Sequence, residues 1–160
     1  MLGIPRKRSG CPPSHDRRVP TLSFALEFRG QATPVSPGVL LTRASGTHAL
    51  LGVEEEALLE GRLSLLDGDS FELAATVGLG DGSAFRLRTL TPGVLAPAPE
   101  TGLRIGTAVC EVDRGAGRLA GVSGRLATSF LLSSTGELTD CQVGVLFVDA
   151  AVREATAVGW

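Results

Sequence analysis

The segment GAGRLAGVSGRLATSFLLSSTGELTDCQVGVLFV, residues 115–148, decides the fold of this chain. Its first ten residues hold four glycines, which supply positive φ angles and close backbone approach. Two alternating apolar runs follow, and residues 134–136 (Ser-Thr-Gly) form a hairpin turn between them. The segment therefore predicts a curled antiparallel β-sheet, and it indicates little about chemistry.

The same alternation of apolar and polar residues, interrupted by turns, is found toward the N-terminus. Residues 21–29 alternate between apolar and polar side chains, as expected for a half-buried strand. Residues 50–66 are ambiguous, because the run that starts at Glu54 suits one or two helical turns whereas its end reads as extended. Three prolines in residues 91–102 predict a long loop. Further strands are expected at 39–44, 71–77, 84–90, 103–113, 124–133 and 138–149.

Seven or eight strands with short turns predict an all-β chain. Sandwiches and closed barrels both protect the edges of such a meander. The late strands are long and follow one another in simple order, which favours an antiparallel up-and-down β-barrel of seven or eight strands. We place this barrel domain at residues 20–150, between a disordered basic tail at 1–19 and a C-terminal extension at 151–160.

Charge and composition limit the classes of partner. Residues 1–19 carry a net charge of +4 within a chain of net charge −2, so the remaining residues carry −6. A weakly acidic body argues against nucleic acid as a partner. No apolar run reaches the length of a membrane helix, and no secretory signal follows the basic N-terminus, so we expect no membrane partner and a cytoplasmic location. One lysine against fourteen arginines indicates high-GC, bacterial coding.

Cofactor and metal chemistry find no support in the motifs. The odd count of cysteines (Cys11, Cys110, Cys141) predicts free thiols, the last two of them as small core residues. The two histidines stand 33 positions apart and suggest no metal site. Residues 78–83 resemble a phosphate loop but lack the following helix and lysine. We therefore expect neither a metal nor another cofactor.

Three polar residues are candidates for catalysis. Glu111 shares a strand face with Ile105 and Val109, and a carboxyl on an apolar inner face would act as an acid or base. Asp140 shares a face with Leu138, Gln142 and Leu146. His48 is a candidate general base at neutral pH. The alternatives are a solvated strand end for Glu111, a polar strand start for Asp140 and a plain loop residue for His48.

Residues 117–126, GRLAGVSGRL, resemble a glycine corner of the barrel proteins grouped around allene oxide cyclase and the dirigent proteins, including bacterial cyclases of polyketide pathways. The resemblance covers residues 103–149. It implies a calycin-like, eight-stranded barrel whose apolar cavity steers the ring closure of a reactive chain. The chain departs from the family at Leu119, where an aromatic residue is frequent, and it contains no tyrosine.

Three functions remain open at this level. The first is a barrel that binds a small apolar molecule and steers its cyclisation or isomerisation in polyketide-type metabolism, mainly by holding it in a reactive conformation. The second is a carrier that binds the ligand without catalysis. The third is a structural barrel with a filled lumen and an oligomeric outer face. A homo-oligomer is expected where arginine-bearing faces such as Arg86 and Arg88 meet acidic ones.

Overall fold

The structure, a computed structural model, describes residues 20–148. These residues fold into nine β-strands joined by short turns, with one turn of 3₁₀ helix at Gly117–Leu119. The predicted tail at 1–19 and extension at 151–160 lie outside the described residues. The strands are β1 (Thr21–Ser36), β2 (Val39–His48), β3 (Glu55–Leu65), β4 (Ser70–Leu79), β5 (Ala84–Thr89), β6 (Gly93–Pro97), β7 (Leu103–Ala116), β8 (Ser123–Ser133) and β9 (Glu137–Phe147).

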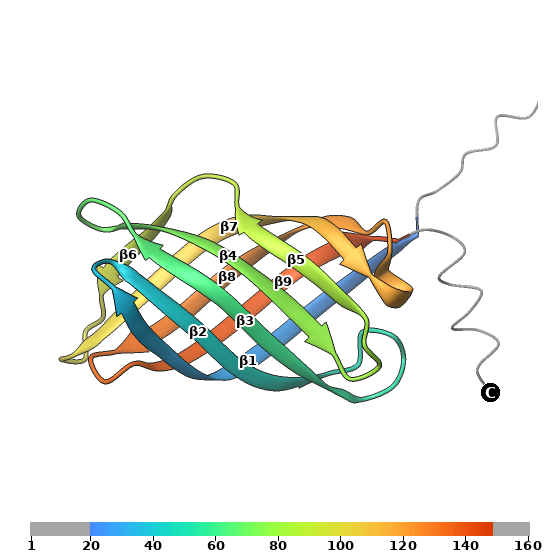
Figure 1. Cartoon of the computed structure of the whole chain (residues 1–160), viewed down its shortest axis with the longest axis horizontal. Coiled ribbons are helices and arrows are strands. Elements are labelled where there is room, and N and C mark those ends of the chain that lie inside the picture. Colours follow the sequence, from blue (N-terminus) through green and yellow to red (C-terminus); the bar gives the residue numbers. More distant parts are fainter. Residues whose placement is uncertain (1–19, 149–160) are drawn as a thin grey trace, which may run out of the picture.

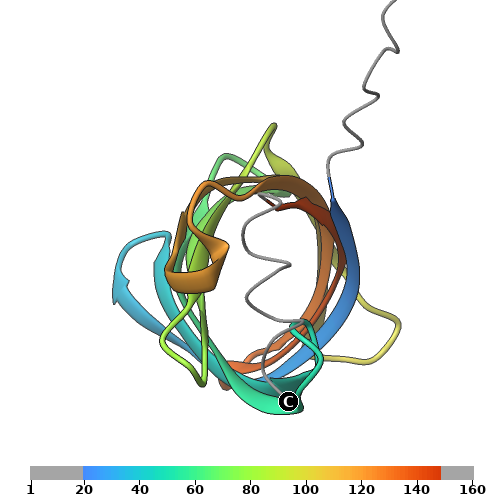
Figure 2. The ribbon, with the colours of Figure 1, turned by 90° about the vertical axis from the view of Figure 1, so that its right-hand side faces the viewer.

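The nine strands close into an eight-stranded antiparallel barrel, as the sequence predicted (Figures 1 and 2). Neighbours in the chain pair in up-and-down order, and β1 closes the barrel against β9 along residues 21–31. Strands β5 and β6 together fill one position, because each pairs with β4 on one side and with β7 on the other. This closure leaves no long unpaired strand edge among the described residues.

Alternation along each strand separates the lumen from the outer wall. In β8, for example, every even-numbered residue from Gly124 to Leu132 is buried and every odd-numbered residue from Ser123 to Leu131 is exposed. Phenylalanine and leucine side chains dominate the inner set, and the largest fully buried ones are Phe28, Phe71, Phe85, Leu59, Leu63, Leu87, Leu95, Leu119, Leu126 and Leu146. The lumen is therefore the hydrophobic core of the molecule.

The glycine corner turns the chain between β7 and β8, in agreement with the prediction. Gly117 and Gly121 have φ angles of 64° and 75°, a region that L-residues rarely adopt. Gly115 and Gly124 allow close approach, because a Cβ on either one would overlap a backbone carbonyl oxygen, that of Leu119 or of Val145. Both roles expected of these glycines are thus present.

One ambiguity of local structure is resolved, and one prediction of local structure is wrong. Residues 55–65 form β3 and contain no helical turn, since alternate side chains such as Ala57, Leu59 and Leu63 enter the lumen. Residues 93–97 form β6 within the segment expected to be one long loop. The prolines permit this strand because Pro92 precedes it and Pro97 is its last residue, where a missing N–H disrupts little of the ladder.

Candidate functional site

A buried polar cluster crosses the otherwise apolar lumen. Asp140 of β9 is 2% exposed and accepts hydrogen bonds from Thr128 Oγ1 of β8 at 2.5 Å and from Gln142 Nε2 at 2.8 Å. Alternation places all three side chains inside, because Thr128 and Gln142 are paired neighbours and Asp140 lies two residues from Gln142 along the same strand. The inward orientation expected for Asp140 is confirmed, and its catalytic role stays a prediction.

A small cavity of about 10 Å³ adjoins this cluster. Its lining includes the carboxyl residue Asp140, the hydroxyl residue Thr42 and the ring of Phe130, with leucines completing the wall. Thr42 Oγ1 and Gln142 Oε1 are buried and have no hydrogen-bond partner in the described part of the chain. A space of this size is close to the minimum for one water molecule, so a larger guest enters only when wall side chains move.

Aromatic rings flank the cavity and fill the lumen. Phe130 packs edge-to-face on Phe71 with 5.1 Å between ring centroids. Each ring lies over a glycine, Phe130 over Gly106 and Phe71 over Gly93, where an added Cβ would overlap the ring. These two glycines therefore make the room that the rings occupy beside the polar cluster.

Burial raises the pKa of Asp140, and the hydrogen bonds from Thr128 and Gln142 oppose that rise in part. Desolvation disfavours the carboxylate, whereas the two donors stabilise it. A carboxyl with a raised pKa in an apolar site can hold a proton and pass it to a bound molecule. Asp140 is therefore a chemically plausible acid inside the lumen.

Glu111 points to the outer wall of β7, so the inward interpretation of this residue is wrong and the solvated alternative holds. Its Oε1 accepts hydrogen bonds from Arg88 Nε at 2.8 Å and from Arg88 Nη2 at 2.6 Å. Arg88 also lies 3.4 Å from Asp113, and these contacts raise its pKa. The inner face of β7 carries the small residues Gly106, Ala108 and Cys110 instead, and Glu111 has no route to the lumen cavity.

His48 ends β2 within a second polar cluster at the barrel end that carries the β2–β3 and β4–β5 turns. Its Nδ1 accepts a hydrogen bond from the Leu50 N–H at 3.1 Å, and its Nε2 lies 3.6 Å from Glu55 Oε2. Burial lowers the pKa of His48, and Glu55 partly offsets this effect. Both ring nitrogens are thus directed at the protein, and His48 does not line the cavity beside Asp140.

The second cluster ties together the turns of that end. Arg118 Nε donates to Asp81 Oδ2 at 2.6 Å, and Ser83 Oγ accepts from the Arg118 backbone N–H at 3.0 Å. The hydrogen bonds from Arg118 and Ser83 outweigh desolvation and lower the pKa of Asp81. These contacts join the glycine corner to the β4–β5 turn, which makes this cluster a structural clamp.

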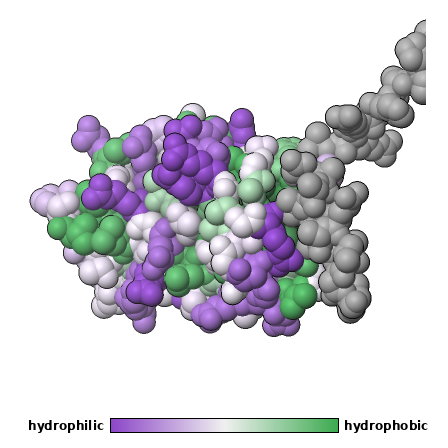
Figure 3. All heavy atoms as spheres, turned by 45° about the vertical axis from the view of Figure 1, so that its right-hand side comes forward, coloured by the Kyte–Doolittle hydropathy of each residue, from purple (hydrophilic) through white to green (hydrophobic). Residues whose placement is uncertain are grey.

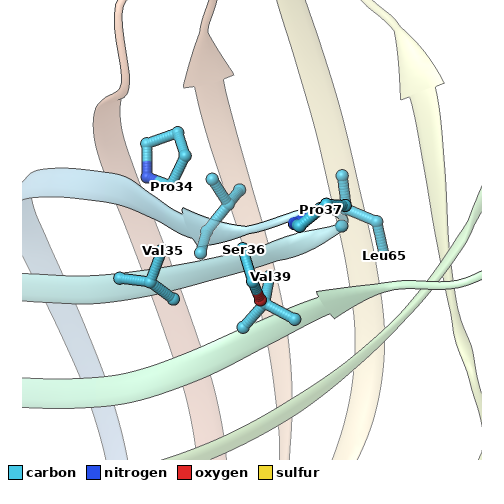
Figure 4. A pocket seen from close by; sticks show the side chains of 8 residues that line it. Pro34, Val35, Ser36, Pro37, Val39 and Leu65 are labelled. Carbon is cyan, nitrogen blue, oxygen red and sulfur yellow. The ribbon is translucent and has the colours of Figure 1, made fainter.

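A larger hollow lies on the outside, at the tip of the β1–β2 hairpin (Figure 4). It has a volume of about 460 Å³ and is lined by Pro34, Val35, Ser36, Pro37, Gly38, Val39, Leu40 and Leu65. In Figure 3 a green, hydrophobic area lies at the left end, the end where Figure 1 shows this hairpin. The hollow offers apolar contact, but its lining contains no titratable side chain, so it cannot move a proton.

The cysteines differ from one another in burial. Cys110 is buried in the lumen, where desolvation raises its pKa to about 12 and leaves the thiol unreactive. Cys141 is exposed on the outer wall, so its expected core position is wrong. Within residues 20–148, no three His, Cys, Asp or Glu side chains gather as metal ligands would. Nor does any helix in this part of the chain have the length and apolarity needed to cross a membrane.

Thr42, Thr128 and Gln142 were not among the candidate residues. Gln142 was recognisable as a face partner of Asp140, because the two stand two positions apart in one strand. For Thr42 and Thr128 the sequence shows only the alternation of their own strands. That alternation predicts which face of the strand a residue is on, but it does not predict which residues of β2, β8 and β9 lie next to one another inside a closed barrel.

The fold of this chain is similar to that of two solved dirigent proteins. It is similar to the pterocarpan synthase dirigent protein PsPTS1, with a TM-score of 0.51 and 13% identity over 81% of this chain and 96% of that one. A second pterocarpan synthase dirigent protein, GePTS1, gives a TM-score of 0.51 and 10% identity over 89% and 98% of the two chains. No model of a known protein family matches the sequence, and no curated protein does. At these identities the likeness shows a shared fold.

Proposed function

We propose that this barrel binds a small apolar molecule in its lumen and steers the cyclisation or isomerisation of that molecule. Asp140 is the observation that carries the proposal. A carboxyl that is 2% exposed among leucine and phenylalanine side chains, with no cation against it within residues 20–148, weakens the fold. Groups that violate the rules of core packing in this way cluster at functional sites.

The surroundings of Asp140 suit a proton transfer to an apolar guest. The cavity wall supplies apolar contact from Phe130 and the leucines, and Thr42 Oγ1 is free to bind one polar group of the guest. Asp140 would give or take a proton, while the barrel holds the chain in one folded conformation. The dirigent-type fold of the two solved structures is consistent with this use of a barrel.

The filled lumen favours the second candidate, a structural barrel without a ligand. A cavity of about 10 Å³ holds no organic molecule, so the guest has to displace Phe130 or a leucine of the wall. A structural barrel needs no such movement. A non-catalytic carrier shares one property with each candidate: it binds a guest, as the catalytic barrel does, and it catalyses no reaction, like the structural barrel.

Incubation with linear apolar precursors, including polyketide-type chains, separates these functions. We expect wild-type protein to accelerate ring closure and to favour one stereoisomer, measured by chiral chromatography. Asp140→Asn should lower the rate about 10²- to 10⁴-fold, the range typical for loss of a general acid. Glu111→Gln is the matched control, since it neutralises a carboxyl on the outer wall, and it should leave rate and stereochemistry unchanged.

The possible outcomes assign the function. Binding without conversion identifies a carrier, and neither binding nor conversion supports the structural barrel. Equal rates for wild type and Asp140→Asn would remove Asp140 from the mechanism and leave shape alone as the source of selectivity.

A further inference from the structure

The two ends of the barrel differ in how they are built. At one end, contacts of Arg118 with Asp81 and Ser83 join the glycine corner to the β4–β5 turn. At the opposite end, the hollow of about 460 Å³ at the β1–β2 hairpin is lined mostly by apolar residues and holds no ionisable side chain (Figures 1 and 4). The lumen is therefore clamped at one end and bordered by an apolar hollow at the other.

A pair of leucines, Leu40 and Leu65, lies between this hollow and the cavity beside Asp140. Leu40 lines the hollow, stands two residues from Thr42 in β2 and pairs across the sheet with Leu63 of β3. Leu65 also lines the hollow and stands two residues from Leu63 in β3. Thr42 and Leu63 both line the cavity. Because residues two apart in a strand share a face at a spacing of about 6.6 Å, the two leucines form the barrier between the hollow and the cavity.

We propose that the hollow is the mouth of the lumen site and binds the apolar end of the guest, an inference that rests on the proposed function. Its volume of about 460 Å³ lies in the range of pockets for small organic molecules, about 300–1,000 Å³. The lining of valine, proline and leucine suits an uncharged chain or ring, since a charged group would lose hydration there without gaining a partner of opposite charge from the lining. The other end of the guest reaches the cavity when Leu40 and Leu65 change rotamer.

The two leucines of this barrier are able to move while the backbone stays in place. Leu40 and Leu65 are partly buried at the edge of the core, whereas Leu63 behind them is 1% exposed. Rotamer changes of exposed side chains take picoseconds to nanoseconds. The backbone is held, because the Leu65 N–H donates to the Gly38 carbonyl oxygen at 2.7 Å. Entry from the hollow therefore requires the movement of side chains and leaves the hairpin in place.

N-phenyl-1-naphthylamine, an uncharged apolar fluorophore, tests the mouth without any turnover, because its emission rises on transfer to an apolar site. Val35 lines the hollow and is 50% exposed, so Val35→Glu should weaken binding of this probe at least about tenfold by placing a carboxylate in the apolar site. Val53→Glu is the matched control, because Val53 is 61% exposed in the β2–β3 turn at the other end, and it should leave binding unchanged. Thermal unfolding verifies that both variants are folded.

Methyl NMR of protein labelled at leucine and valine locates the bound probe. The signals of Leu40 and Leu65 should shift first and that of Leu63 at higher probe concentration. The signal of Leu51, which packs against the core from the β2–β3 turn, should stay unchanged. Shifts that begin at Leu51, or equal affinities of the two valine variants for the probe, would overturn the proposal. So would shifts at the hollow when protein concentration rises without probe, because a second copy would then occupy it.

The same measurements separate the mouth from the proposed reaction. Asp140→Asn should bind the probe in the hollow as wild type does, because Asp140 lies behind the two leucines, while its turnover falls. A protein that converts a precursor but whose two valine variants bind the probe equally would refute the mouth and leave the reaction standing. Absence of probe binding to the wild type would also overturn the mouth.

Discussion

Replacing Phe130 with alanine tests whether the lumen can become a binding site beside Asp140. Phe130 is 3% exposed, packs on Phe71 at 5.1 Å and lines the cavity with Thr42 and Asp140. Phe→Ala changes in a core cost about 3–5 kcal/mol, and loss of the aromatic pair favours the upper part of that range. For a domain of this size, about 4 kcal/mol corresponds to a fall in Tm of about 10–15 °C.

The space left by the ring joins the existing cavity, which makes the variant a test of ligand chemistry. Phenol should raise the Tm of Phe130→Ala more than benzene does, because its hydroxyl reaches polar groups of the cavity wall while its ring replaces the lost one. Thermal unfolding by circular dichroism, with and without each compound, measures this difference. The shift grows with ligand concentration over Kd, so a titration gives the affinity.

Phe24→Ala is the matched control. Phe24 is also buried and also pairs with an aromatic ring, that of Phe85 at 6.1 Å, but it does not line the cavity beside Asp140. The control should lose comparable stability and show no preference for phenol over benzene. Equal responses of the two variants to phenol, or a loss below about 1 kcal/mol for Phe130→Ala, would refute the packing described here.

Three further predictions concern stability. Because the folded-state pKa of Asp140 is raised, stability should fall as pH rises from about 4 through that pKa, and Asp140→Asn should flatten this fall in pH-dependent urea unfolding. Because the pKa of His48 is lowered on folding, stability should fall as pH drops below about 6.5, and His48→Gln should reduce that loss in the same assay. Gly115→Ala should cost about 1–3 kcal/mol, since its Cβ overlaps the Leu119 carbonyl oxygen. Gly78→Ala places its Cβ in ordinary contact, 3.9 Å from the Leu58 carbonyl oxygen, and should be nearly neutral by urea unfolding. Equal costs for the two variants would contradict the close approach at Gly115.

The barrel could be predicted because its signals are local. Alternation with a period of two and glycine-rich turns each depend on a few consecutive residues, and up-and-down closure follows from short connections. The corner at residues 115–124 illustrates this, since the conformations of Gly117 and Gly121 are properties of the turn itself. β6 was missed because the three prolines flanking or ending it outweighed its five residues in the pattern.

The direction in which β7 faces could not be predicted, and the reason is physical. Its two faces are both apolar: Gly106, Ala108 and Cys110 face inward, whereas Ile105 and Val109 face outward beside Glu111. Hydrophobicity favours the larger outer set as the core face. The inner residues are small because the Phe130 ring occupies the space over Gly106, a contact with another strand. Because the outer face of β7 is as apolar as its inner face, hydrophobicity could not predict on which face Glu111 lies.

The polar cluster shows a different limit, and it also separates the two candidate functions. Asp140 occupies an inward position between Leu138 and Gln142, a place where a leucine would satisfy the alternation and avoid the cost of a buried carboxyl. A filled structural barrel gains no stability from that carboxyl. The two side chains that donate hydrogen bonds to it, Thr128 and Gln142, are also polar groups buried in the lumen. A third polar group, Thr42 Oγ1, has no hydrogen-bond partner within residues 20–148. A binding barrel needs such groups, since an apolar guest is oriented by a few polar contacts. The cost in stability is then the consequence of a site, and an Asp140 variant that gains stability while losing turnover would be its signature.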